Sequence, residues 1–222
     1  MRRPPSRRRP LRRLLARLAP AERRILDQPE EYRGLSADVA RDVAKTWRAK
    51  LAGVLPRWWA HVQRVSRRAR LVAPLFSVDN GELLVGAALL HDIGYAPELV
   101  GTGFHPLDGA RYLRGVGGPE RLVNLVAHHS CATLEAELRG LSDELADFED
   151  ERTALRDALW WADMTTTPDG GGTTVAERVA EIQTRYGTDN LVSCFIRRAW
   201  NGLNAAVERT QHRLEAAGIS QA

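Results

Sequence analysis

The chain has 222 residues, 44% of them hydrophobic and 27% charged, a composition typical of a soluble globular protein with a single domain. The longest apolar run, Leu83 to Leu90, is too short to cross a bilayer, so we expect no membrane span and a cytoplasmic location. Cys131 and Cys194 form no recognisable pair, which argues against a disulfide scaffold and against a cysteine-based zinc site.

The net charge of +4 is distributed unevenly along the chain. Residues 1–24 contain ten arginines and a single acid, Glu22, so this segment carries +9 and the remaining chain carries −5. The segment is also rich in proline and poor in large apolar side chains, which favours disorder. We therefore interpret residues 1–35 as a disordered basic tail, with nucleic acid or another anionic surface as an alternative partner for it.

Beyond the tail, apolar residues recur at helical spacing, and no alternating strand pattern or internal repeat occurs. Asp79-Asn80-Gly81 is interpreted as a turn or cap, and the triple glycine 170–172 as a hinge or loop tip over a site. The sequence predicts a compact all-α domain over residues 36–222. Its predicted helices are 36–55, 57–72, 82–93, 105–114, 119–129, 134–148, 151–165, 173–186 and 189–217.

Histidines and aspartates gather on the inward faces or the ends of these helices. His61 lies on a stripe with Trp58 and Val65, and Asp163 follows Leu159 on an otherwise apolar face. An unpaired carboxylate on such a face is costly, and a bound metal ion would offset that cost. His91, Asp92, His105, His128 and His129 complete the set, whereas His212 is predicted to lie on the surface. Imidazole and carboxylate ligands together suit Fe, Mn, Zn or Mg.

The adjacent histidines His128 and His129 are separated by the periodicity of the predicted helix 119–129. His129 falls on the apolar stripe with Leu122, whereas His128 shares a polar face with Asn124. We therefore favour His129 as the inward histidine and keep His128 as an alternative. His105 opens its helix after a glycine-rich loop, where the ring can turn into a cleft.

The order of these residues resembles the HD superfamily of metal-dependent phosphohydrolases. AALLHDIG (residues 87–94) is similar to the central signature of that superfamily, and HVQRVSRRA (61–69) is similar to its first helix. FHPLDGARYL (104–113), LVAHHS (125–130) and ADMTT (162–166) resemble its later segments. Two departures are Tyr95, where the family often has lysine, and the missing Gly-Tyr-Pro of the cyclic-dinucleotide branch.

The resemblance implies an HD-type helical bundle with one or two divalent metal ions. It assigns His61, His91, Asp92 and Asp163 as ligands of one ion, and His105 and His129 as ligands of a second ion that Asp92 bridges. The resemblance thereby implies hydrolysis of a nucleotide or another small phosphate ester.

Further roles are predicted around this ligand set. Asp92 would position the attacking water or act as its base, and Arg64, one turn beyond His61, would contact the substrate as a catalytic phosphate-binding group. Arg111 is a second candidate for binding the phosphate. Asp108 and Ser130 are expected to orient His105 and His129.

Two other functions fit the same residues. A di-iron oxygenase of HD-like fold would use the same six ligands, and reduced iron that consumes dioxygen would identify it. A non-enzymatic, metal-bound sensor or scaffold would combine the metal site with a tail that binds nucleic acid, and salt-sensitive binding to polynucleotides without ester turnover would identify it.

Overall fold

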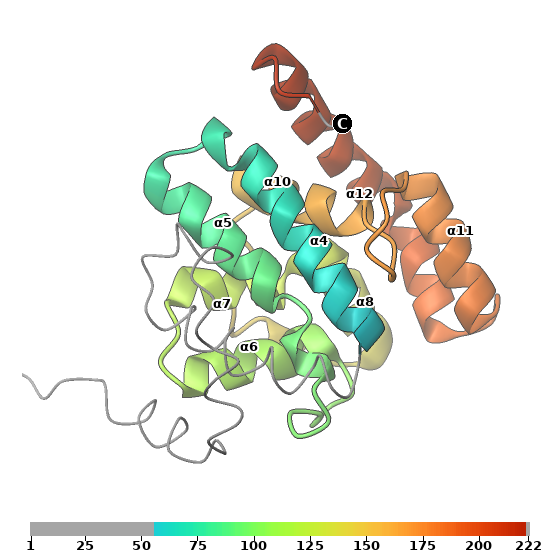
Figure 1. The fold of residues 1–222 in the computed structure, drawn as a ribbon. Coiled ribbons are helices and arrows are strands. Elements are labelled where there is room, and N and C mark those ends of the chain that lie inside the picture. Colours follow the sequence, from blue (N-terminus) through green and yellow to red (C-terminus); the bar gives the residue numbers. More distant parts are fainter. Residues whose placement is uncertain (1–55, 221–222) are drawn as a thin grey trace, which may run out of the picture.

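The computed structural model describes residues 56–220, and over this range the all-α prediction is confirmed (Figure 1). The predicted tail, 1–35, and the predicted helix 36–55 lie outside the described residues. The only extended pairing among the described residues is an isolated bridge between Thr166 and Gly172. The helices are α4 (Pro56–Val72), α5 (Val78–Leu90), α6 (His105–Gly115), α7 (Glu120–Ala127), α8 (Ala132–Arg139), α9 (Ser142–Leu145), α10 (Ala154–Met164), α11 (Val175–Tyr186) and α12 (Leu191–Ala216), with 3₁₀ turns η2 (Ala73–Leu75), η3 (Ile93–Tyr95) and η4 (His129–Cys131).

Local side-chain chemistry defines the starts of the last three helices. The Thr153 hydroxyl accepts the backbone N–H groups at the start of α10, and the Asn190 side chain accepts that of Val192 in α12. Helix α11 begins with a reciprocal capping box between Thr174 and Glu177. These caps satisfy donors that have no partner within the helix and fix where each helix begins.

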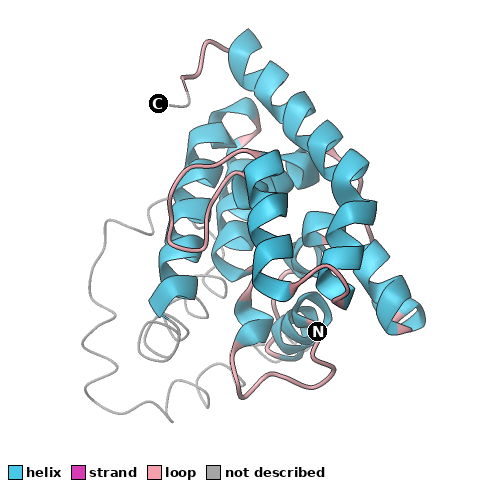
Figure 2. Cartoon of the chain, turned by 90° about the vertical axis from the view of Figure 1, so that its right-hand side faces the viewer, coloured by secondary structure: helices cyan, strands magenta, loops and turns pink. Residues whose placement is uncertain are grey.

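The helices form one layered bundle. Helices α4 and α5 lie side by side, α6 packs against α7, and α10 packs between α4 and the 26-residue α12, which runs along one side of the molecule (Figures 1 and 2). Trp161 of α10 is fully buried in this core, together with Leu84 of α5 and Leu203 of α12. Burial of apolar surface at these contacts is the main stabilising contribution to such a fold.

Several boundary predictions were wrong, and three of them are instructive. Asp79-Asn80-Gly81 lies within the first turn of α5 rather than forming a turn, because a glycine at position 81 allows close packing against Ala73. The predicted helix 134–148 is interrupted at Gly140, whose φ of 68° ends α8. Helix α7 ends at Ala127, two residues before the predicted limit.

An ion pair joins α10 to α12, between the buried Asp157 and the half-exposed Arg209. The Asp157 side chain is only 6% exposed, and its two oxygens accept hydrogen bonds from Arg209 Nε and Nη2 at 2.8 and 2.9 Å. Replacing Asp157 with alanine should lower the free energy of unfolding by about 2–4 kcal/mol, because it removes a bidentate charged contact from the core. Urea denaturation of the variant measures this loss.

A matched exposed pair supplies the control for this experiment. Arg198 of α12 also binds an acid of a neighbouring helix, Glu137 of α8, but both side chains are nearly half exposed. Glu137→Ala should therefore change the free energy of unfolding by about 1 kcal/mol or less. Equal losses in the two variants would show that burial does not set the strength of the Asp157 pair.

No helix among the described residues has the length and apolar character needed to span a membrane.

Candidate metal centre

Five separate segments bring the predicted ligands to one place. His61 comes from α4, His91 and Asp92 from the turn that ends α5, and His105 from the first residue of α6. His129 begins η4 after α7, and Asp163 lies one residue before the end of α10. All six side chains are buried except His105, whose side chain is 16% exposed.

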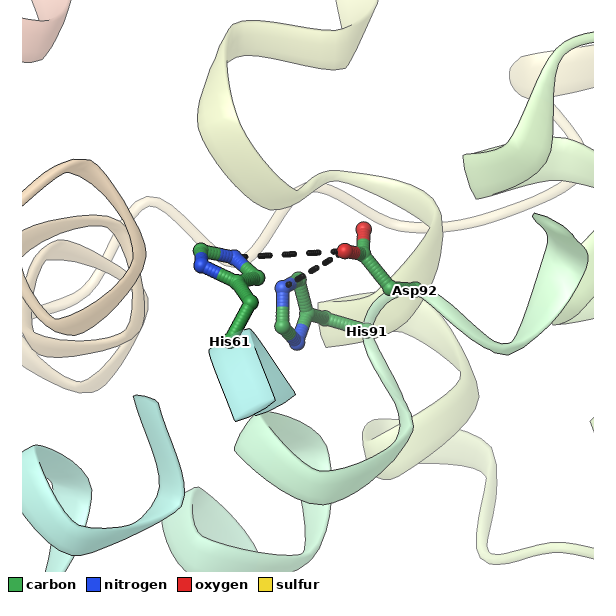
Figure 3. Close-up of side chains that lie close together, drawn as sticks. All are labelled: His61, His91 and Asp92. Atoms are coloured by element: carbon green, nitrogen blue, oxygen red, sulfur yellow. Dashed lines mark ion pairs between the residues drawn. The ribbon is translucent and has the colours of Figure 1, made fainter. Parts of the chain in front are cut away.

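The Asp92 carboxylate lies between two pairs of histidines. Its Oδ2 atom is 3.9 Å from His61 Nε2 and 3.4 Å from His91 Nε2, the group drawn in Figure 3. Its Oδ1 atom is 3.3 Å from His105 Nε2 and 3.8 Å from His129 Nε2. Each oxygen thus faces a different potential metal position, and within each of the two groups the ligand atoms lie within 4.8 Å of one another.

Asp163 belongs to the first of these two groups. Its Oδ1 atom lies 3.1 Å from His61 Nε2 and 3.9 Å from His91 Nε2. Its Oδ2 atom accepts a hydrogen bond from the Ser130 hydroxyl. The first group therefore offers two histidines and two carboxylates, whereas the second offers two histidines and shares Asp92.

Backbone carbonyl groups orient three of the four histidine rings. In each ring Nδ1 lies within hydrogen-bond distance of a carbonyl oxygen, so Nε2 is the nitrogen that faces the cluster. The pairs are His61 with Thr167 (3.1 Å), His91 with Ala88 (2.9 Å) and His129 with Val126 (2.7 Å). The Nε2 atom of His91 is buried and has no hydrogen-bond partner, a costly state that a metal ion would relieve.

Ring stacking orients His105, for which no hydrogen bond at Nδ1 is present. The Tyr95 ring lies nearly parallel to the His105 ring, with 3.9 Å between centroids and 17° between planes. Trp58 packs on the other side of this stack, 4.1 Å from Tyr95. The second group therefore depends on an aromatic stack for the position of its most exposed ligand.

Removal of the Tyr95 ring should weaken binding of the second metal ion selectively. We expect Tyr95→Ala to lower the affinity for that ion about 3- to 10-fold, which corresponds to the interaction energy of a stacked aromatic pair. The first ion should bind as before. Tyr95→Phe keeps the ring and should bind both ions as the wild type does. Calorimetric metal titration of the two variants checks this, and equal affinities for the second ion would contradict it.

The turn after α7 adopts an unusual backbone conformation beside the cluster. Ser130 and Cys131 have φ values of 47° and 62°, in the left-handed region that side chains rarely adopt. This turn directs His129 toward His105 and the Ser130 hydroxyl toward Asp163. Two strained residues in succession at a cluster of ionisable groups are typical of a functional site.

The cluster stabilises its carboxylates as anions. Burial raises the pKa of Asp92, but the charges of His91, His105 and His61 together with the hydrogen bond to His105 outweigh burial and lower it. Burial likewise opposes ionisation of Asp163, yet the hydrogen bond from His61 and the neighbouring imidazoles hold its pKa well below the ordinary value. Both acids are therefore charged and able to bind a cation.

The histidine pKa values move in opposite directions. Burial lowers the pKa of His61, but its hydrogen bond to Asp163 and the two carboxylate charges raise it overall, so a proton competes with a metal ion there. Burial and the charges of His105 and His91 lower the pKa of His129 to about 3, which keeps that ring neutral and able to ligate. Burial and the charge of Asp92 raise the pKa of Tyr95 well above its usual value.

The two adjacent histidines have different surroundings. His129 faces the cluster, with 3.0 Å between its Nε2 and that of His105. His128 is buried away from the cluster, and its Nε2 contacts the Phe148 carbonyl oxygen at 2.8 Å. The polar face predicted for His128 and Asn124 was wrong, since both side chains are buried.

The cluster opens into a partly enclosed cavity. Neither Arg64 nor Arg111 is among the residues that line it. Arg111 is exposed on α6, and the Cβ of Arg64 lies near the backbone of Gly170, in the loop after α10. That loop packs against α4 and does not line the cavity, contrary to the predicted loop tip over the site.

Two predicted supporting residues have other contacts. Asp108 accepts the backbone N–H groups of Gly101, Thr102 and Gly103, so it folds the loop before His105 rather than contacting the ring. Ser130 binds Asp163 instead of His129. Hydroxyl and carboxylate side chains so close in sequence to a ligand can bond either to the ring or to nearby backbone, and the sequence does not distinguish these outcomes.

Several lining residues were not singled out from the sequence, among them Trp58 as a wall, Glu135 of α8, and Arg178 and Arg185 of α11. Arg178 carries a signal that could have identified it. It lies one turn from Val175 and from Ile182, on the buried face of α11, as Asp163 lies on the buried face of α10. Arg178 and Asp163 thus show the same sequence signal, a charged residue on the apolar face of a helix.

Family comparison agrees with this geometry. An all-α bundle with buried histidine and aspartate ligands from five segments is the arrangement of a metal-dependent hydrolase. Residues 58–163, which contain all six candidate ligands, match the family model described as HD domain. The resemblance noted in the sequence is therefore confirmed as an HD domain match over these residues, which make up just under half of the chain. No curated protein and no solved structure matches it.

Proposed function

We propose that the chain is a phosphohydrolase that binds two divalent metal ions at this centre and hydrolyses a small phosphate ester. The observation that carries the proposal is the position of Asp92, whose two oxygens face separate histidine pairs. Two ligand atoms at about 2.0–2.2 Å from a common ion lie roughly 3–3.5 Å apart, close to the separations within each group. Imidazole and carboxylate ligands of this kind can bind Fe, Mn, Zn or Mg.

The donor set fits such ions without rearrangement. Asp92 and Asp163 are held as anions, and the Nε2 atoms of the histidines point at them. Metal ions bound there would supply Lewis acidity, which lowers the pKa of a water molecule and polarises a phosphoryl oxygen.

The residues of the protein would then contribute mainly by holding the ligands in place and by limiting access of water. We assign Asp92 as a bridging ligand rather than a general base, because both of its oxygens face histidines and its lowered pKa makes it a weak base. Ser130 fixes Asp163 by donating to Oδ2, so that Oδ1 faces His61 and His91. The enclosing stack of Trp58 and Tyr95 limits access of water from that side.

The substrate class is a small organic phosphate, of which nucleotides are one kind. The cavity lies beside the ligand cluster, and its lining combines apolar side chains with a few charged and polar ones, as small-molecule sites do. Binding of polynucleotides is predicted for residues 1–35 only. Because these residues lie outside the described range, the binding stays a prediction. The domain division at residue 35 is likewise a proposal.

Turnover measurements test the proposal. Metal-loaded protein should hydrolyse members of a panel containing p-nitrophenyl phosphate, its diester and nucleotides, and His91→Ala should remove the first metal ion together with the activity. Bound metal without turnover of any ester would contradict the proposal, and dioxygen consumption by an iron-loaded sample would then favour the oxygenase. Wild-type protein that binds no metal would exclude both enzymes.

A further inference from the structure

The last two helices close the cavity from outside the HD-matched residues. The match ends at Asp163, whereas α11 and α12 begin at Val175 and Leu191 and pack against each other. Both helices line the cavity opposite the histidine cluster. This α11–α12 hairpin is therefore the part of the site that distinguishes the chain from the matched family region.

Arg178 is the buried cation of this hairpin. The residue is 8% exposed, and it lines the cavity together with His61 and Asp163. Its Nη1 contacts Glu181 at 2.5 Å, and its Nε has no hydrogen-bond partner among the residues that the structure describes. Glu181 also pairs with Arg185, so one partly exposed carboxylate is shared between two guanidinium groups. Within the described range, Arg178 forms no ion pair with an acid of the metal cluster.

Apart from Arg178, Arg185 and Tyr186, the hairpin surface in the cavity is apolar. Ile182 of α11 and Val192, Phe195 and Ile196 of α12 form this surface, which we call the apolar wall. No asparagine or glutamine lines the cavity. A sugar placed against these four side chains would find no hydrogen-bond partner among them, whereas an apolar group would bury surface favourably.

We propose that the α11–α12 hairpin forms the substrate subsite, in which Arg178 binds the phosphate group and the apolar wall contacts the alcohol portion of an aryl or alkyl phosphate ester. A guanidinium presents paired N–H donors that match phosphate oxygens, and it is most effective where water is excluded. The inference rests on the proposed phosphohydrolase function for its reaction, but the subsite itself is a binding property and is measurable without turnover.

Calorimetric binding of inorganic phosphate and phenyl phosphate to the metal-loaded full chain tests the role of Arg178. Arg178→Gln should weaken both ligands about 10- to 100-fold, and Arg178→Lys should weaken them less because it keeps the charge but loses the paired donors. Arg197→Gln, an exposed α12 residue outside the cavity, is the control and should bind as the wild type does. Metal content and melting temperature are measured for every variant.

The apolar wall has its own variant. The wild type should bind phenyl phosphate more tightly than inorganic phosphate, and Val192→Asn should reduce this preference while leaving phosphate affinity unchanged. Val192 is only half-buried, so the substitution should be tolerated.

The outcomes separate the subsite from the reaction. Phosphate binding that is absent in the wild type, or equal in wild type, Arg178→Gln and Arg178→Lys, overturns the subsite even if esters are hydrolysed. A missing preference for phenyl phosphate overturns the apolar wall. Binding that depends on Arg178 without turnover of any ester upholds the subsite and contradicts the hydrolase proposal instead.

Discussion

Asp92→Asn is expected to abolish binding of both metal ions, whereas Asp163→Asn should remove only one. Asp92 is the residue whose two oxygens face the two histidine pairs, while Asp163 contacts only His61 and His91. Elemental analysis after metal loading distinguishes the variants by the number of ions per chain. Hydrolysis by Asp92→Asn should fall by about three orders of magnitude or more, since the proposed reaction depends on both ions.

Thermal unfolding gives an independent measure of the same prediction. Ions at about 100 times their dissociation constant stabilise the folded state by about 3 kcal/mol each, so added metal should raise the melting temperature of the wild type by several degrees. Asp92→Asn should show no such increase. If it binds two ions, or if Asp163→Asn loses both, the assignment of Asp92 as the shared ligand is wrong.

Gly94→Ala should both destabilise the fold and distort the second metal group. A β-carbon at position 94 would lie 2.0 Å from the carbonyl oxygen of His105 and 2.7 Å from the backbone nitrogen of Gly109. These are backbone atoms, so no rotamer change relieves the clash, and α6 must move away from η3. We expect a loss of about 3 kcal/mol or more in unfolding free energy, together with weaker binding of the ion beside His105.

Gly115→Ala is the matched control for this substitution. Gly115 is the last residue of the same helix, α6, and a β-carbon there meets no atom within 4 Å. Its substitution should change stability by about 1 kcal/mol or less, and in the favourable direction where helix propensity dominates. Denaturant titration compares the two variants, and equal stabilities would show that close approach of η3 and α6 is not required.

The metal cluster was predictable because each ligand lies on an apolar stripe or at a helix end. Asp163 is the clearest case: an acid one turn after Leu159 on a buried face has to be compensated, and the structure surrounds it with His61 and Ser130. The bridging position of Asp92 came from the family resemblance alone, because the direction in which each carboxylate oxygen points depends on the packing of five segments.

The residue proposed to bind phosphate, Arg178, was not predictable in the same way. Helical spacing placed Arg64 near His61. Adjacent faces of one helix can contact different parts of the protein, however, and the Cβ of Arg64 lies near the loop at Gly170. Arg178 lies 117 residues from His61, and only the return of α11 across the bundle brings the two to one cavity. Local periodicity identifies which side chains are buried but not which buried side chains meet.

The number of metal ions bound per chain tests the account most directly. Elemental analysis of the purified, metal-loaded wild type should find close to two divalent ions per chain, and treatment with a chelator should remove them together with hydrolysis of phosphate esters. Protein that binds no metal above the background of the buffer, with an unchanged melting temperature on metal addition, would contradict the account.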